Sequence, residues 1–223
     1  MTQITAHSGS DGTADNCLSF IQFFLDKPID ALEVDIRKNH LGELVLNHDA
    51  LELREYPSLK EAFLLLKGSK ILLNCDLKES NLETEVEQLA RTCDYWEFVQ
   101  LSGAVSMAFV QRWPEKVLVN IENTNPVFLL EDWYESDVFE ALSLLANQGA
   151  KVINIHYKQL TSNIYQKGRS LGLNFSVWTV NDLDKIQAFQ EQGVYNITTR
   201  SAWVYLQLKE DQHEVLKSET IVS

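Results

Sequence analysis

Cysteine, proline and glycine are all scarce in this chain of 223 residues. The three cysteines, Cys17, Cys75 and Cys93, are odd in number and widely spaced, which argues against a disulfide framework and against a cysteine-based metal site. We interpret them as buried, reduced thiols. No stretch of proline, glycine or serine marks a linker, so the length favours one large domain over two small ones.

Basic residues are also few, because 19 Lys and Arg face 32 Asp and Glu and leave a net charge of −13. Such a surface repels nucleic acid and anionic lipid headgroups, so neither is an expected partner. A small anionic substrate is still compatible with this charge, since a metal ion or a lysine can reverse the field inside one pocket.

Long apolar runs are missing as well. No stretch approaches the ~18 apolar residues that a membrane span requires. The first residues, MTQITAHSGSDG, lack the basic and then apolar pattern of a signal peptide. We therefore expect a soluble, cytoplasmic protein.

What the chain does contain is an alternation of short β-rich runs with longer runs of helical period. Eight such β-then-α units predict a parallel sheet with helices outside it, and their number favours closure into a (β/α)8 TIM barrel of the α/β class. The strand-like runs are residues 3–6, 31–36, 70–76, 98–101, 117–121, 151–155, 174–178 and 195–198.

We assign residues 1–208 to one barrel domain and residues 209–223 to a polar C-terminal tail, which we expect to fray. Residues 126–133 are irregular and apolar. They fit a lid, a dimer contact or part of the core, and the oligomeric state stays open.

In a (β/α)8 barrel the active site lies at the carboxyl ends of the strands. Glu33 and Asp35 are two apart on one strand, so they point to the same face. There they repel each other unless a cation or a proton lies between them. Asp76, from the next strand, adds a third carboxylate. This set, without clustered cysteine or histidine, favours Mg²⁺ or Ca²⁺ over zinc, although Glu33 and Asp35 also fit solvated surface carboxylates.

His7 and His48 follow strand ends too. Histidine titrates near neutral pH, so one copy can donate a proton while the other accepts one. A lone histidine after a strand is more often a hydrogen-bonded structural residue. Two of them beside a carboxylate pair favour catalysis.

Several short motifs resemble those of the glycerophosphodiester phosphodiesterase family, in the same order along residues 4 to about 200. The opening ITAHSG with Asp15 and Asn16 is similar to the family's His-Arg-Gly and Pro-Glu-Asn-Thr motifs, and LEVD at residues 32–35 to its Glu-x-Asp strand. The other matching segments are GELVLNHD (42–49), NCDLK (74–78), VWTVN (177–181) and GVYNITT (193–199). Each motif is weak alone, but the ordered set is specific.

The resemblance implies a TIM barrel that hydrolyses a glycerol phosphodiester to an alcohol and glycerol 3-phosphate with a divalent metal. By position, the residues with implied roles are Glu33, Asp35 and Asp76 as metal ligands, His7 and His48 as general acid and base, and Lys78 as the partner of a phosphate oxygen. Ser8 and Trp178 are the implied substrate contacts, although Trp178 also fits a buried core residue.

The chain also departs from the family pattern. Ser8 replaces an arginine, Asp15 and Asp76 replace glutamates, and Arg200 lies near the final aspartate of the last motif. The usual small insertion domain is missing, because only 26 residues separate Asp49 from Asp76. A more open mouth fits a bulkier diester, such as a lysophospholipid. The alternative function is a catalytically weak or inactive barrel that binds a phosphorylated ligand.

Overall fold

A computed structural model describes residues 2–123 and 134–221 of the chain, so the apolar stretch at 126–133 lies outside the described residues. Its centre is a single sheet in which eight strands run parallel. In spatial order these are β5 (Val99–Gly103), β4 (Leu72–Leu77), β2 (Ala31–Lys38), β1 (Gln3–Ala6), β9 (Asn196–Thr199), β8 (Asn174–Trp178), β7 (Val152–His156) and β6 (Leu118–Asn120). One parallel bridge, between Leu101 and Val117, joins the two ends of the sheet. The predicted (β/α)8 barrel is therefore confirmed as a nearly closed barrel.

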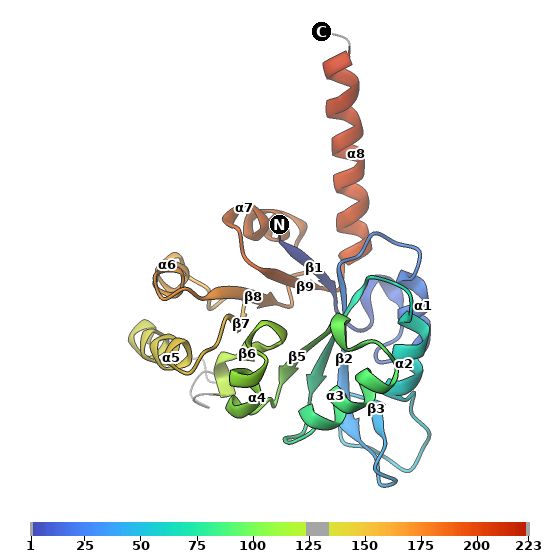
Figure 1. Ribbon diagram of the computed structural model, residues 1–223. Coiled ribbons are helices and arrows are strands. Elements are labelled where there is room, and N and C mark those ends of the chain that lie inside the picture. The colour runs from blue at the N-terminus through green and yellow to red at the C-terminus, as the bar shows by residue number, and fades with distance from the viewer. Residues whose placement is uncertain (1, 124–133, 222–223) are drawn as a thin grey trace.

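Helices surround the sheet on the outside (Figure 1). They are α1 (Leu18–Phe24), α2 (Leu59–Leu66), α3 (Glu83–Thr92), α4 (Met107–Arg112), α5 (Glu135–Asn147), α6 (Ser162–Ser170), α7 (Leu183–Gln192) and α8 (Ala202–Ile221). Short 3-10 turns lie at η1 (Ser10–Gly12), η2 (Trp96–Phe98), η3 (Pro114–Lys116) and η4 (Ile121–Asn123). No helix among the described residues combines the length and apolarity that crossing a bilayer requires.

The period of two along β2 separates its core face from its polar face. Leu32, Val34 and Ile36 have no exposed surface and belong to the hydrophobic core. Glu33 and Asp35 alternate with them and line a pocket inside the barrel mouth. The strand pattern alone therefore directs both carboxylates inward.

An extra strand, β3 (Leu44–Leu46), pairs antiparallel with the end of β2. The hairpin returns the chain to the barrel mouth, where the amide of Asn47 donates to the carbonyl of Asp35 at 3.0 Å. His48 follows directly. Between Asp49 and Asp76 the chain holds a loop, α2 and most of β4, and no insertion domain.

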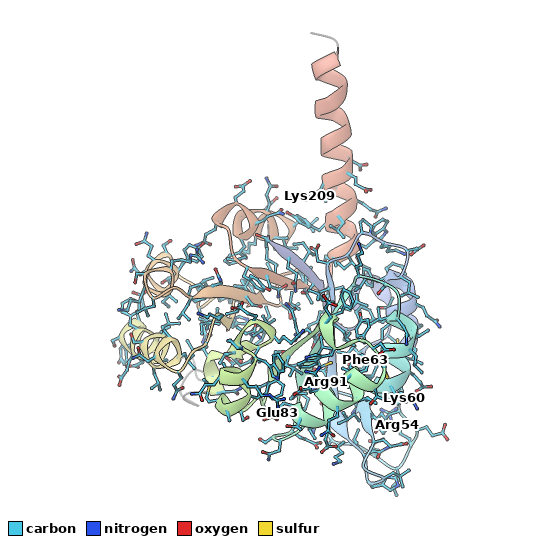
Figure 2. The ribbon with its side chains drawn as sticks, viewed as in Figure 1. Arg54, Lys60, Phe63, Glu83, Arg91 and Lys209 are labelled. Carbon is cyan, nitrogen blue, oxygen red and sulfur yellow. The ribbon has the colours of Figure 1, made fainter. Side chains whose placement is uncertain are left out.

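Helix α8 continues to Ile221, past the predicted barrel boundary at residue 208. In Figure 1 its second half stands clear of the other elements, on the side opposite the β2–β3 hairpin. Lys209 lies where α8 leaves the body (Figure 2) and donates to Gln190 of α7 at 2.5 Å. The residues expected to fray are thus helical as far as 221, while the division into barrel and tail stays a prediction.

Candidate active site

Seven of the eight predicted site residues line one pocket of about 290 Å³ at the carboxyl ends of the strands. The exception is Ser8. The complete lining is His7, Glu33, Asp35, His48, Asn74, Asp76, Lys78, Ser102, Asn120, Glu122, Asn154, Trp178, Thr179 and Thr198. The barrel therefore brings together residues from all eight parallel strands or from the segments that follow them.

Three carboxylates form a cluster on neighbouring strands. Asp35 of β2 and Asp76 of β4 are register partners, and each offers an oxygen within 4.8 Å of one from Glu33. Glu33 and Asp35 are 6% and 3% exposed. Burial, together with the charges of Asp35 and Asp76, raises the pKa of Glu33 well above its usual value. Since buried carboxylates repel one another without a cation, this oxygen-only donor set fits a hard divalent metal.

Lys78 bridges two members of the cluster. Its Nζ lies 2.9 Å from Asp35 Oδ1 and 2.6 Å from Asp76 Oδ2. Burial alone would lower the pKa of this lysine, but the two carboxylates outweigh burial and raise it. Lys78 is therefore a fixed positive charge beside the cluster.

His7 is held at the end of β1 in one tautomer. Its Nδ1 lies 2.8 Å from the carbonyl oxygen of Ser8. A carbonyl accepts only, so Nδ1 carries the hydrogen and Nε2 is the basic nitrogen of the neutral ring. Burial lowers the pKa of His7, which keeps the ring in this neutral form.

His48 has a comparable arrangement in a more open place. Its Nδ1 lies 2.9 Å from Asp49 Oδ1, and its side chain is 65% exposed. Since the carboxylate accepts, Nε2 is again the nitrogen that is free to take a proton. In both histidines Nε2 is thus the nitrogen that can take a proton. His7 is the more buried of the two, and His48 is the more exposed.

Ser8 is fully buried and lies behind the cluster instead of lining the pocket. Its amide donates to Glu33 Oε2 at 3.2 Å, and its hydroxyl accepts from the amide of Asn16. This geometry fits the positioning of Glu33. Direct contact of Ser8 with a substrate stays a prediction that the pocket lining does not support.

Sequence reasoning missed the role of Asn16. Its Nδ2 donates to Asp35 Oδ2 at 2.7 Å, and its Oδ1 accepts from the amide of Asp35 at 2.9 Å. Its φ of 50° is one that Asn tolerates better than most residues. The Asp15-Asn16 motif was visible in the sequence, but no pattern in the neighbouring residues indicated that Asn16 contacts β2.

Seven uncharged or acidic residues in the pocket were also missed: Asn74, Ser102, Asn120, Glu122, Asn154, Thr179 and Thr198. Ser102, Asn120, Glu122, Thr179 and Thr198 lie at or next to strand ends, which was the available signal, whereas Asn74 and Asn154 lie in the middle of β4 and β7. Burial raises the pKa of Glu122.

Trp178 lines the pocket, as predicted, and packs edge to face against His156 with ring centroids 5.1 Å apart. Its indole nitrogen is buried and has no hydrogen-bond partner among the residues that the structure describes.

Two of the departures from the family pattern contact each other. Arg200, directly after β9, forms an ion pair with Asp15 at 2.7 Å. Both side chains are substantially exposed, so the pair links the loop after β1 to the last strand without entering the core.

Comparison with solved structures identifies the same kind of barrel in glycerophosphodiester phosphodiesterases. The enzyme from Parabacteroides distasonis superposes with a TM-score of 0.72 at 17% identity, over 95% of this chain and 98% of that chain. The enzyme from Thermotoga maritima gives 0.70 at 15% identity, over 93% and 98%. An Oleispira antarctica phosphodiesterase in complex with the product sn-glycerol-3-phosphate gives 0.68 at 16% identity, over 94% and 97%.

No family model matches the chain, and no curated protein matches its sequence. At these identities the structural likeness shows the fold, and it agrees with the resemblance of the motifs.

Proposed function

We propose that this chain is a divalent-metal-dependent phosphodiesterase that hydrolyses a glycerophosphodiester to an alcohol and glycerol 3-phosphate. The observation that carries the proposal is the single pocket that unites two histidines, three clustered carboxylates and a lysine. The nature of the structural neighbours supports the same reaction class. We expect a small-molecule substrate that is met in the cytoplasm.

Each residue has a part that follows from its geometry. Glu33, Asp35 and Asp76 would hold Mg²⁺ or Ca²⁺, and the bound ion would polarise the phosphoryl group and stabilise negative charge on it. Lys78 would add a positive charge at the cluster.

Proton transfer is assigned to the histidines. In both His7 and His48, Nδ1 is the ring nitrogen that forms the hydrogen bond. This leaves Nε2 as the nitrogen for proton transfer. One would accept the proton of the attacking group, and the other would donate a proton to the leaving alcohol. Either order is compatible with the geometry.

A second candidate is a barrel that binds a phosphorylated ligand without efficient turnover. The observation that favours it is the state of Lys78, which is the one Lys or Arg among the described residues that line the pocket. It is already ion-paired with two carboxylates, and Ser8 supplies no charge in place of an arginine.

Hydrolysis of a diester panel separates the two candidates. The panel is glycerophosphocholine, glycerophosphoethanolamine, lysophosphatidylcholine and a chromogenic bis-ester, each with Mg²⁺, with Ca²⁺ and with EDTA. We expect metal-dependent release of an alcohol, and a loss of about 10²–10⁴-fold in kcat for His7→Asn and for His48→Asn. Faster turnover of the lysophospholipid would match the absence of an insertion domain.

The control variant is His40→Asn, on the exposed tip of the β2–β3 hairpin, which should keep full activity. If the metal-loaded protein hydrolysed none of the diesters, the proposed phosphodiesterase activity would be refuted. If phosphate or glycerol phosphate nevertheless raised the melting temperature, the second candidate would replace it.

A further inference from the structure

Two chains of hydrogen bonds run from pocket carboxylates to amide side chains inside the barrel. In the first, the hydroxyl of Ser102 donates to Asp76 Oδ1 at 2.6 Å and accepts from Asn74 Nδ2 at 3.0 Å. A carboxylate only accepts, so the single hydroxyl hydrogen points to Asp76, and Asn74 must present its NH₂ group to Ser102. The Oδ1 atom of Asn74 is thereby left with no hydrogen-bond partner among the described residues.

The second chain starts at Glu122. Its Oε1 accepts from Asn120 Nδ2 at 3.3 Å, and Asn120 Oδ1 accepts from the amide of Gly103 at 3.4 Å. The backbone amide of Gly103 can only donate, so it fixes Oδ1 of Asn120 as the acceptor and Nδ2 as the donor. Asn154 must then donate through Nδ2, at 2.9 Å from Asn120 Oδ1, and its own oxygen has no partner within the described part of the chain.

An unpaired buried amide oxygen is costly, and folded proteins rarely keep one without a reason. Asn74 and Asn154 are only 3% and 8% exposed, yet both line the pocket. Both oxygens call for N–H or O–H donors. Glu122 is a further acceptor in the pocket lining, and it lies outside the three-carboxylate cluster.

We propose that Asn74, Asn154 and Glu122 form an acceptor wall, which binds the organic part of the ligand through its hydroxyl or ammonium hydrogens. The proposal rests on the proposed function, in which the carboxylate cluster and Lys78 receive the phosphate. The wall then selects phosphate esters whose carbon chain carries hydrogen-bond donors, and disfavours plain alkyl esters of equal size.

Calorimetric binding to the Mg²⁺-loaded full chain tests the wall without any turnover. Glycerol 3-phosphate is compared with propyl phosphate, which has the same carbon chain but lacks both hydroxyls. Ethanolamine phosphate is compared with ethyl phosphate, so the second pair tests ammonium in place of hydroxyl. We expect the donor-bearing member of at least one pair to bind more tightly, by about fivefold for each hydrogen bond gained.

Asn154→Leu removes the free oxygen and keeps the volume of the side chain. It should abolish the preference within the pair. The matched control is Gln100→Leu, a buried amide of β5 that does not line the pocket, and it should keep the preference. If Asn154→Leu does not fold, the two ligand pairs on the unaltered protein decide alone.

Equal affinity within both pairs would overturn the wall, and the two oxygens would then bind ordered water only. Diester hydrolysis without such a preference would refute the acceptor wall and leave the proposed function standing. A preference without hydrolysis would support the acceptor wall and refute the proposed hydrolytic function. Failure of inorganic phosphate and of all four esters to bind would refute both.

Discussion

At the scale of single residues, Asn16 decides how Asp35 is held. It exchanges two hydrogen bonds with that residue, one to the carboxylate and one from the backbone amide. Neither residue is free to turn, because both are buried. Such supporting contacts commonly set the affinity of a metal site as strongly as the ligands themselves.

We therefore expect Asn16→Gly to weaken metal binding. Glycine keeps the φ of 50° without strain and removes both side-chain bonds. We expect the dissociation constant for Mg²⁺ or Ca²⁺ to rise by about 10–100-fold, measured by calorimetry. Asn81→Gly is the control, since Asn81 is exposed and has a φ of 67°. Equal effects from the two variants would contradict a supporting role for Asn16.

The raised pKa of Glu33 predicts that the stability of the protein depends on pH. This pKa is raised in the folded protein, so the folded state binds this proton more tightly than the unfolded chain does. Metal-free protein should thus lose stability as pH rises from the ordinary glutamate pKa through the raised one. Glu33→Gln mimics the protonated form and should escape this loss. Urea unfolding in EDTA, from about pH 5 to about pH 8, measures the difference.

Added divalent metal should oppose the loss in the unaltered protein at the upper end of that range, because the ion replaces the proton between the carboxylates. The Gln variant should respond far less. If the free energy of unfolding of the two proteins changed with pH in the same way and responded equally to metal, a raised pKa of Glu33 would be refuted.

At the scale of elements, a buried carboxylate joins α3 to α4. Glu87 of α3 is 4% exposed and accepts from Arg91 of its own helix at 2.9 Å. It also accepts from Arg112 of α4 and from the indole nitrogen of Trp113 at 3.3 Å each. Arg91 is labelled in Figure 2 together with Glu83, a second buried carboxylate of the same helix.

Glu87→Ala should lower the free energy of unfolding by about 1–3 kcal/mol, because three hydrogen bonds to a charged group are lost. The loss is no larger because both arginines are about half exposed and regain hydrogen bonds to water. Glu85→Ala is the control on the same helix, since its single ion pair with Lys38 is more exposed. Equal losses in chemical denaturation would show that Glu87 does not join the helices.

At the scale of the whole molecule, the second half of α8 lies outside the barrel (Figure 1). Helical segments that pack against nothing contribute little stability in water. Removing residues 210–223 should therefore leave the melting temperature and the secondary structure of the barrel unchanged, as measured by circular dichroism. A fall in the melting temperature comparable to that of Glu87→Ala would show that this segment belongs to the domain, and the division at residue 208 would be wrong.

The barrel and most of the pocket were predictable from sequence for a local reason. Strand periodicity, helix periodicity and the order of the two are all properties of short segments, and eight units leave few ways to bury their apolar faces. The same alternation placed Glu33 and Asp35 on one face. Ordered motifs then indicated His7, His48, Asp76, Lys78 and Trp178, all of which line the pocket.

Other features depended on contacts between distant segments. Ser8 was predicted to contact the substrate because it stands where the family has an arginine, yet the turn of the chain directs its amide to Glu33 and leaves it out of the pocket lining. Asn16 reaches Asp35 only because the loop after β1 folds over β2. The course of α8 beyond residue 208 was missed because polar composition alone does not distinguish a helix from a frayed tail.

By itself the sequence determined the class of fold and the inward direction of Glu33 and Asp35, since these follow from period and order, while the resemblance of the motifs indicated the other pocket residues. Only the tertiary structure decided which groups are paired and which are left unpaired. Lys78 is committed to two carboxylates, whereas the oxygens of Asn74 and Asn154 are left without donors. Pairing depends on the register of strands that meet across the barrel, and register is set by the packing of the whole chain.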